Sequence, residues 1–239
     1  MKSLVVGYRT MKCVILASGF GTRLYPLTIN RAKALLEFNG TPLITHIINR
    51  LPDDMEVFVT TNRKFEASFR QWSKTLGRAV TFCVEPVFTE EQSMGAVGSL
   101  NYCVTTNNIL DDLLVIAGDN YFESNLCEFI SSYDGQTTLV GIYDTGDKNK
   151  CRQFGVVGLD GLKIIKFDEK PAEPQSSLIA TACYILPARI FPLLSQFCYG
   201  RKKDNLGSFI AYLMAKDVVH AYTFTNIWFD AGNGDYLLV

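Results

Sequence analysis

Residues 13–23, CVILASGFGTR, join a short apolar run to a glycine-containing turn. The run from Cys13 to Ala17 predicts a buried strand, because it is continuously apolar and too short for a helix. Gly19 and Gly21 allow a tight turn whose exposed N–H groups favour anions, and Arg23 adds a cation suited to phosphate. Because no Gly-Lys-Ser/Thr follows and Leu24 stands where a third glycine belongs, the turn is neither a Walker phosphate loop nor a good dinucleotide fingerprint.

Outward from this turn, apolar runs alternate with stretches of helical period. Further strands are expected at residues 57–60, 80–84 and 113–117, and helices at 42–51, 64–76 and 94–104. The first helix has Thr41 as its expected cap and Pro42 in its first turn. This βαβ series predicts parallel strands with helices on both faces of the sheet.

The pattern changes after Asp119, where expected strands follow one another more closely. They lie at residues 137–143, 154–159, 163–167, 179–186 and 218–225, with helices at 188–197 and 206–216. Asp160-Gly161 predicts a hairpin turn between two of them. We therefore expect one α/β domain, with a Rossmann-like mixed, mostly parallel sheet, helices on both faces and a β-rich second half.

Composition excludes several classes of protein. The chain has 239 residues, 48% of them hydrophobic, and a net charge of -1, which argues against disorder and against a general nucleic-acid or membrane-surface binder. Seven scattered cysteines and two histidines predict neither a zinc site nor a disulfide framework, so the thiols are expected as reduced core residues. The apolar run within residues 1–10 is too short for a signal peptide. A cytoplasmic enzyme or binding protein is therefore expected.

Three charged residues stand where chemistry is expected. Lys33 follows the glycine turn by ten positions, although an arbitrary lysine is usually a solvated one. Asp119 comes just after an expected buried strand, where open α/β sheets bind ligands and where one carboxylate can begin a magnesium site; a plain turn is the alternative. Asp230 follows an aromatic run and needs a partner, either a metal shared with Asp119 or a helix beginning before Tyr236.

Together these segments resemble the signature of the sugar-1-phosphate nucleotidylyltransferases, in particular those of glucose-1-phosphate thymidylyl and uridylyl transfer. The resemblance rests on residues 16–24, LASGFGTRL, on Pro26-Leu27-Thr28 and Ala32-Lys33, and on later segments in the same order. The later segments are Gly118-Asp119-Asn120, Phe154-Gly155-Val156-Val157, Glu169-Lys170-Pro171 and Trp228-Phe229-Asp230-Ala231-Gly232. The family joins a nucleoside triphosphate to a sugar 1-phosphate and releases pyrophosphate.

The resemblance implies a role for each matching position. It implies that Mg²⁺ is held by Asp119 and Asp230, that Lys33 neutralises the reacting phosphates, and that Arg23 contacts the leaving pyrophosphate. The nucleotide would be bound by Ala17, Gly19, Gly21, Thr22, Arg23, Glu85 and Gly95. The sugar phosphate would be bound by Gly155, Glu169, Lys170 and Thr181. Ala182 stands where relatives often have glycine, which would narrow the sugar side of the site.

Other interpretations stay open at this point. A nicotinamide dehydrogenase would need an acidic residue ending the second strand, and Glu37 does not end one. A non-catalytic nucleotide or sugar-phosphate sensor, and guanylyl or cytidylyl transfer to another phosphorylated acceptor, are the remaining alternatives to dTTP or UTP with glucose 1-phosphate. Residues 1–10 are interpreted as an extension and 11–239 as the catalytic domain, with nucleotide binding in 11–120 and sugar-phosphate binding in 121–239. No nucleic-acid or membrane partner is expected, and monomer and homodimer both remain open.

Overall fold

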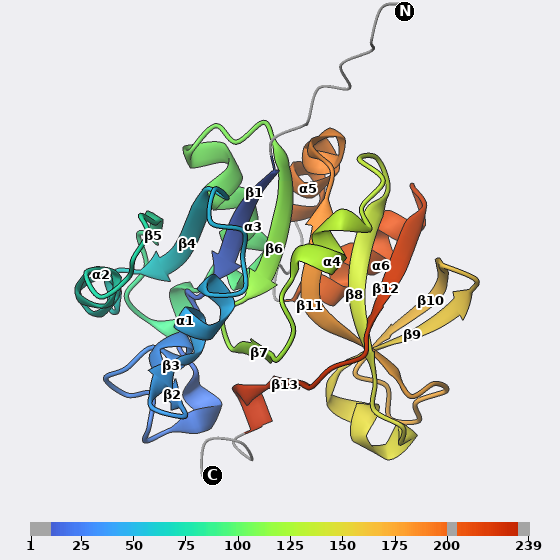
Figure 1. Ribbon diagram of the computed structural model, residues 1–239, viewed down its shortest axis with the longest axis horizontal. Coiled ribbons are helices and arrows are strands. Elements are labelled where there is room, and N and C mark those ends of the chain that lie inside the picture. Colours follow the sequence, from blue (N-terminus) through green and yellow to red (C-terminus); the bar gives the residue numbers. More distant parts are fainter. Residues whose placement is uncertain (1–10, 200–204, 234–239) are drawn as a thin grey trace, which may run out of the picture.

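The computed structural model describes residues 11–199 and 205–233. The expected extension at residues 1–10 therefore lies outside the described residues, whereas the alternative of a helix capped by Asp230 corresponds to the described 3-10 turn Ala231–Asn233. A nine-stranded sheet runs through the described part in the order β5-β4-β1-β6-β11-β8-β12-β10-β9 (Figure 1). Among the described residues no helix is both long and apolar enough to cross a membrane.

The first half of the sheet is parallel, as the alternation of apolar runs and helices predicts. β1 pairs with β4 and β6, and β4 pairs with β5, all in parallel register. The bounds are Met11–Leu16 for β1, Val57–Asn62 for β4, Thr81–Glu85 for β5 and Asp112–Ala117 for β6. Cys13, Val14 and Ile15 are fully buried because helices cover both sides of β1.

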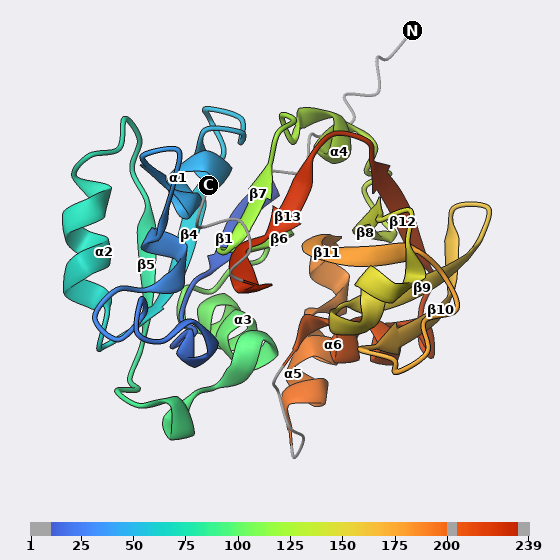
Figure 2. The same cartoon turned by 90° about the horizontal axis from the view of Figure 1, so that it is seen from below.

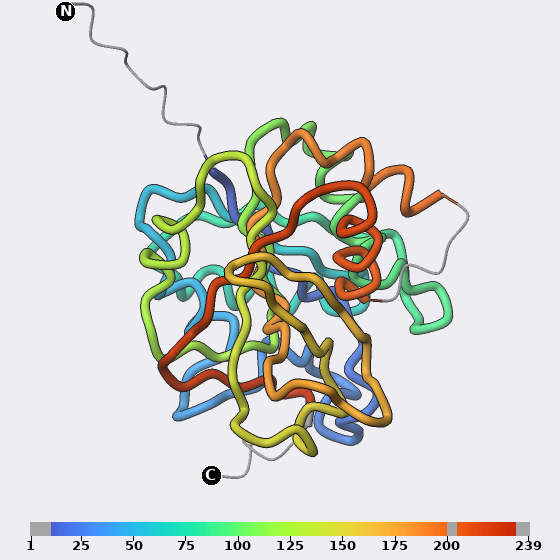
Figure 3. Tube along the Cα trace, turned by 90° about the vertical axis from the view of Figure 1, so that its right-hand side faces the viewer, coloured from blue at the N-terminus to red at the C-terminus, as the bar shows by residue number. Residues whose placement is uncertain are grey.

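The second half is mainly antiparallel, so the sheet as a whole is mixed. β11 (Leu178–Leu186) runs antiparallel to both β6 and β8 (Thr138–Asp144), whereas β12 (Val219–Phe224) is parallel to β8. β9 (Gly155–Asp160) and β10 (Lys163–Glu169) form the expected hairpin, and Gly161 takes the positive φ of +57° that its turn requires. Figure 3 views the molecule from the end of the sheet that these two strands form.

Helices cover the two faces and enclose two buried clusters. α3, α5 and α6 lie on one side of the sheet, with α1 and α4 on the other (Figure 2). The bounds are α1 Leu43–Ile48, α2 Glu66–Ser73, α3 Gly95–Thr106, α4 Cys127–Ser131, α5 Phe191–Cys198 and α6 Leu206–Met214. Leu100, Phe197 and Phe209 belong to the cluster beneath α3, α5 and α6, and Ile44 and Phe69 to the opposite one. Each face therefore buries its apolar stripe against the sheet.

The first helix begins later than its sequence predicts. Thr41–Pro42 forms β3 and pairs with β2 (Glu37–Phe38), so the helix begins at Leu43, and Thr41 does not cap it. The hydrophobic stripe of the helix is as expected, since Ile44, Ile47 and Ile48 are buried. The error lies at the boundary, because the Thr-Pro signal for a helix start also suits a short strand pair.

Two very short strands, absent from the sequence-based expectations, lie beside each other at the carboxyl ends of the parallel strands. β7 (Asn120–Phe122) and β13 (Trp228–Asp230) form an antiparallel ribbon in which Asn120 pairs with Asp230 (Figure 1). Because β7 follows β6 directly, Asp119 lies in the connection between the two strands. The ribbon therefore places Asp119 and Asp230, separated by 111 positions, at one edge of the sheet.

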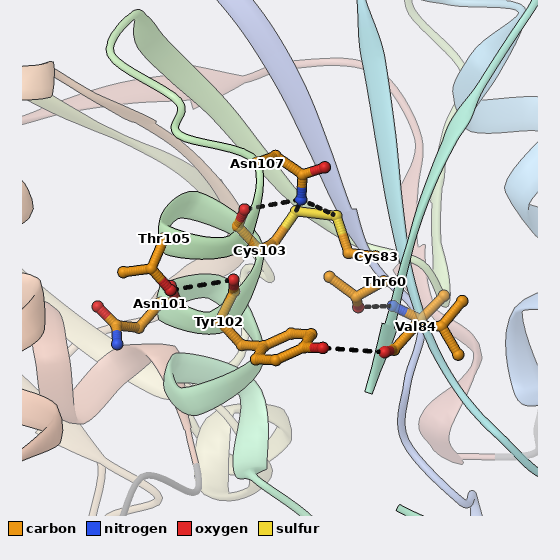
Figure 4. The surroundings of a disulfide bond; sticks show 9 residues. Thr60, Cys83, Val84, Asn101, Tyr102, Cys103, Thr105 and Asn107 are labelled. Carbon is orange, nitrogen blue, oxygen red and sulfur yellow. Dashed lines mark hydrogen bonds between the residues drawn. A yellow bond between two sulfur atoms is a disulfide. The ribbon is translucent and has the colours of Figure 1, made fainter. Parts of the chain in front are cut away.

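Cys83 and Cys103 form a disulfide, so the expectation that all seven thiols are reduced core residues is wrong for this pair. The bond joins β5 to α3, where Tyr102 donates a hydrogen bond to the Val84 carbonyl at 3.2 Å (Figure 4). The apolar character of both positions predicts burial, and their pairing depends on the packing of α3 against β5. Four of the five free cysteines are buried as expected, and Cys127 is exposed.

Alkylation of the denatured, unreduced protein is expected to modify five cysteines, namely Cys13, Cys127, Cys151, Cys183 and Cys198. Replacing Cys83 and Cys103 together by alanine is expected to lower the free energy of unfolding by about 3 kcal/mol, because the bond closes a loop with a separation of 20 residues. Mass spectrometry after alkylation and urea denaturation measure the two effects. Labelling of seven thiols under these conditions would contradict the pairing.

Candidate active site

A cleft of about 400 Å³ opens where the two halves of the sheet meet. Its walls come from the ends of β1, β6 and β10, from the middle of β11, from the β7–β13 ribbon, and from the first turns of α3 and α6. Eleven of the fourteen site residues expected from the sequence line it. They are Ala17, Gly19, Gly21, Lys33, Gly95, Asp119, Gly155, Glu169, Lys170, Thr181 and Asp230.

The glycine turn forms one end of the cleft and needs glycine at position 21. Gly21 has φ +67°, and a side chain there would meet Thr28, whose hydroxyl donates to the Gly21 carbonyl at 2.6 Å. The turn is further tied to the sheet, because Ala17 N donates to the Thr60 hydroxyl at 3.0 Å. Gly19 has nothing within 4 Å of where a side chain would begin, so its backbone is open to a ligand.

Lys33, Asp119 and Asp230 form the charged centre of the cleft. Lys33 lies in a short 3-10 helix, Lys33–Leu35, and its ammonium contacts Asp119 and lies 3.4 Å from Asp230 Oδ1. Its side chain is only 18% exposed. Lys33 is therefore a partly buried ion-pair partner of both carboxylates, and the alternative of an ordinary solvated lysine is excluded.

The charges of this centre perturb one another. Burial alone would lower the pKa of the Lys33 ammonium, but Asp119 and Asp230 outweigh it and raise that pKa. Burial, followed by the charge of Asp119, raises the pKa of Asp230 to about 6, although Lys33 and the Gly232 N–H act in the opposite direction. Asp230 also accepts from Gly232 N at 2.5 Å, so it caps the turn that follows.

The two carboxylates suit a hard divalent cation that is shared with a phosphate. Both lie around a single positive group, the Lys33 ammonium, so the arrangement already accepts a cation. Within residues 11–199 and 205–233 no group of three or more His, Cys, Asp or Glu side chains could hold a metal alone. A pair of carboxylates completed by substrate oxygens is the donor set typical of Mg²⁺.

The opposite wall is formed by Glu169 and Lys170 at the end of β10. Burial raises the pKa of the Glu169 carboxyl, and the charge of Lys170 offsets only part of the shift. Gly155 and Gly207 leave the space that Phe167 and Glu169 occupy, since a side chain at Gly155 would begin 2.5 Å from the Phe167 ring. Lys170 itself has φ +48°, an uncommon conformation for a side-chain-bearing residue.

A buried carboxyl group lies behind the end of the cleft that the glycine turn forms. Glu85 ends β5 and is 1% exposed, and its Oε1 has no hydrogen-bond partner among the described residues. Burial raises the pKa of Glu85, while hydrogen bonds from Ser18 and Ser99 act the other way. Gly95 begins α3 with φ +67° and lines the cleft beside this region.

Three expected residues lie outside the lining of the cleft. Glu85 is buried behind it, and Thr22 donates its hydroxyl to Glu90 at 2.8 Å, which joins the glycine turn to the loop before α3. Arg23 is exposed in the 3-10 turn Thr22–Leu24. Arg23 lies beside the glycine turn, as the sequence implies, but its side chain does not line the cleft.

Sequence reasoning missed one residue that joins the two walls. Asn120 is 2% exposed, and its amide donates to the Thr181 carbonyl at 2.6 Å, connecting the β7–β13 ribbon to β11. The only signal in the sequence is the polar residue directly after Asp119, which fits a turn equally well. The two histidines play no part here, since His46 bonds the Phe38 carbonyl and His220 lies in β12.

The chain is similar to known proteins over most of its length. A family model described as nucleotidyl transferase matches residues 12–238. A candidate mannose-1-phosphate guanyltransferase from Sulfolobus acidocaldarius is 25% identical over 93% of this chain and 60% of its own length. A UTP–glucose-1-phosphate uridylyltransferase, AglF, from Haloferax volcanii is 28% identical over 83% of this chain and 79% of its own.

Among solved structures, a candidate glucose-1-phosphate thymidylyltransferase from Bacillus anthracis superposes with a TM-score of 0.82. It is 25% identical, and the match covers 96% of this chain and 93% of that one. The chain thus spans about three fifths of the Sulfolobus relative and nearly all of the Bacillus protein. The resemblance noted in the sequence is confirmed, and the chain belongs to the nucleotidyl transferase family.

Proposed function

We propose that this chain transfers a nucleotidyl group from a nucleoside triphosphate to a sugar 1-phosphate. A phosphate oxygen of the sugar attacks the α-phosphorus, the bond to the β-phosphate breaks, and pyrophosphate leaves with the electron pair. The observation that carries the proposal is the meeting of Lys33, Asp119 and Asp230 in one cleft with Lys170. These groups come from distant parts of the chain, and together they suit a reaction between two phosphorylated compounds.

The main barrier to such a reaction is electrostatic. Two unit charges of like sign 4 Å apart repel by about 4 kcal/mol at an effective dielectric of 20. Lys33 and Lys170 would lower this repulsion from two sides of the cleft, and the partly buried position of Lys33 makes its charge more effective than it would be in water. The attacking oxygen is already ionised, so no general base is needed, in agreement with a cleft that neither histidine lines.

Mg²⁺ would be held by Asp119 and Asp230 together with triphosphate oxygens. When bound, it would supply neutralisation of the charge that develops on the leaving pyrophosphate. Lys33, which pairs with both carboxylates here, would then be free to contact the phosphates. The chain's own contribution is to position the phosphates and to keep their surroundings positive.

We infer dTTP or UTP as the nucleotide and glucose 1-phosphate as the acceptor. The uridylyltransferase AglF and the fold match to the Bacillus protein support this pair. Mixing the protein with each common nucleoside triphosphate, each of several sugar 1-phosphates and Mg²⁺, and measuring pyrophosphate, tests it. Release should be fastest with dTTP or UTP and glucose 1-phosphate. Absence of release with every pair would contradict the transfer itself.

GTP would be a second candidate only with Glu85 ionised and in contact with the base. An ionised carboxylate accepts two hydrogen bonds, and guanine offers two adjacent N–H donors, whereas uracil and thymine offer one donor between two carbonyls. The raised pKa of Glu85 favours the protonated form, which offers one donor and one acceptor and so suits the pyrimidines. The guanyltransferase relative is consistent with the ionised alternative.

Replacing Glu85 by glutamine separates these two candidates. With a pyrimidine substrate, kcat/KM is expected to change by less than about threefold, because the amide also offers a donor and an acceptor. If GTP is the true substrate, kcat/KM should fall about 100-fold, because the amide N–H of the new glutamine would face an N–H donor of guanine. Steady-state pyrophosphate release measures kcat/KM with each nucleotide. The control is Glu91→Gln, because Glu91 is an exposed neighbour in the sequence.

A further inference from the structure

Gly207 is a glycine inside a helix, in the first turn of α6. Glycine is among the least favourable residues for a helix, and the backbone does not require it here, since Gly207 is not among the glycines with positive φ. The residue is buried and lines the cleft beside Asn205, which caps α6 by accepting from Ser208 N. The reason for glycine at this position must therefore lie in the space around it.

Two side chains of β10 fill the space beside Gly207. α6 packs against β10, and a side chain at position 207 would overlap Glu169 Oε2 and begin 2.8 Å from the Phe167 ring. Real side chains do not approach one another so closely, so the Glu169 carboxyl or α6 itself would have to move. The carboxyl is the easier of the two to displace, because it is the far end of a flexible side chain.

A second glycine, Gly155, borders the same space. Gly155 pairs directly with Glu169 in the β9–β10 hairpin, so a side chain at position 155 would stand next to that of Glu169. It would begin 3.3 Å from Glu169 Oε2 and 2.5 Å from the Phe167 ring. Gly155 of β9 and Gly207 of α6 thus adjoin one carboxyl oxygen, and we call the space between these two residues the glycine slot.

The glycine slot holds a carboxyl group that faces the cleft. Glu169 lines the cleft next to Lys170, and an ionised carboxylate there accepts hydrogen bonds from hydroxyl groups but repels phosphate. A free glutamate side chain populates several rotamers, and ordering it when a ligand binds would weaken binding. Packing against Phe167 and the two glycines restricts the Glu169 carboxyl before any ligand is present.

We propose that Gly207 is a positioning residue for sugar recognition: because it has no side chain, the Glu169 carboxyl lies in the glycine slot, where it accepts hydrogen bonds from hydroxyl groups of the sugar 1-phosphate. This inference rests on the proposed function, because it takes the ligand at this wall to be the sugar. Gly207 offers the sugar no side chain and acts through Glu169. A methyl group at position 207 would turn the carboxyl out of the slot, and the hydroxyl groups would lose their acceptor.

Gly207→Ala tests this inference through pyrophosphate release with glucose 1-phosphate, the preferred nucleotide and Mg²⁺. Burial raises the pKa of the Glu169 carboxyl, so the assay is run at pH 8. We expect kcat/KM for glucose 1-phosphate to fall at least tenfold, as when one hydrogen bond to a charged group is lost. The affinity for the nucleotide alone should change by less than about twofold.

Two further variants show whether the effect passes through Glu169. Adding Gly207→Ala to Glu169→Ala is expected to change kcat/KM by less than about twofold, because the carboxyl that the methyl would displace is already absent. Ser208→Ala, in the same turn of α6 but outside the cleft lining, is the matched control. It should stay within about twofold of the wild type.

An equally large loss with and without the Glu169 carboxyl would overturn the inference, because the methyl would then act on Phe167 or on the packing of α6. A loss below threefold in Gly207→Ala, or an equal loss in Ser208→Ala, would also overturn it. If Gly207→Ala does not fold, the double variant with Glu169→Ala decides. A folded double variant with the kcat/KM of Glu169→Ala supports the overlap with the carboxyl, and an unfolded one overturns it.

The proposed function is tested separately. Isothermal titration of glucose 1-phosphate, in the presence of a non-hydrolysable α,β-methylene analogue of the triphosphate, compares the same variants without turnover. A tenfold weaker affinity in Gly207→Ala that disappears in the Glu169→Ala background supports the role of Gly207. Failure of the wild type to release pyrophosphate would count against the proposed function alone.

Discussion

Asp119→Asn is expected to lower kcat about 1000-fold and to leave the fold intact. Asparagine keeps the shape of the side chain but removes the negative charge, so the site loses one of the two carboxylates that would hold Mg²⁺ and one of the two partners of Lys33. Losses of 100-fold to 1000-fold are typical when one preorganised charge-stabilising group is removed. Pyrophosphate release at saturating Mg²⁺ and substrates measures the effect.

Asp144→Asn is the matched control for this variant. Asp144 also ends a strand, β8, but it is exposed and lies outside the cleft lining. Its replacement is expected to leave kcat within about twofold, as for a typical surface substitution. If Asp119→Asn retained near wild-type turnover at saturating Mg²⁺, the role assigned to Asp119 would be wrong.

Lys33→Met is expected to reduce both turnover and stability. Turnover should fall about 100-fold to 1000-fold, because the reacting phosphates lose the positive group nearest the two carboxylates. The free energy of unfolding at pH 8 should fall by about 2 kcal/mol, since two partly buried carboxylates would lose their cation. Lys166→Met is the control, because Lys166 pairs with Asp168 at the surface, where such pairs contribute little.

The stability loss in Lys33→Met should depend on pH. Burial and Asp119 raise the pKa of Asp230 to about 6, so the folded state binds this proton more tightly than the unfolded state does. The stabilisation from that proton is complete below the unfolded pKa of about 4 and is lost as pH rises through 6. At pH 5 most Asp230 carboxyls are protonated and need no cation, whereas at pH 8 they are ionised. The deficit of Lys33→Met, meaning its loss in free energy of unfolding relative to the wild type, should therefore be smaller at pH 5 than at pH 8. Urea denaturation at both values measures it, and an equal deficit at the two would contradict the buried pairing.

The sequence predicts well those features that local pattern determines. Four of the five residues from Cys13 to Ala17 are buried, all but Leu16, so the composition of the run alone identifies a central strand. The Asp160-Gly161 turn is set by local backbone geometry, and the hairpin follows. The position of Asp119 after a buried strand likewise predicts an edge where ligands bind.

Features that depend on distant segments could not be predicted in the same way. β7 and β13 have three residues each, too few for any periodic signal, and they exist because Asn120 and Asp230 meet across the ribbon. The Cys83–Cys103 bond needs α3 to pack on β5. The positive φ of Ala182 depends on hydrogen bonds from Asn120 and to Gly141, three separate parts of the chain.

Paramagnetic broadening of ³¹P resonances by Mn²⁺ tests most directly whether both phosphates meet at the carboxylate pair. The sample would contain the protein, a non-hydrolysable α,β-methylene analogue of the preferred triphosphate, a sugar 1-phosphate and substoichiometric Mn²⁺. We expect the phosphorus signals of both ligands to broaden together in the wild type and to stay sharp when Asp119 and Asp230 are both replaced by asparagine. Equal broadening in that double variant, or broadening of only one ligand in the wild type, would contradict a single cleft built around Lys33, Asp119 and Asp230.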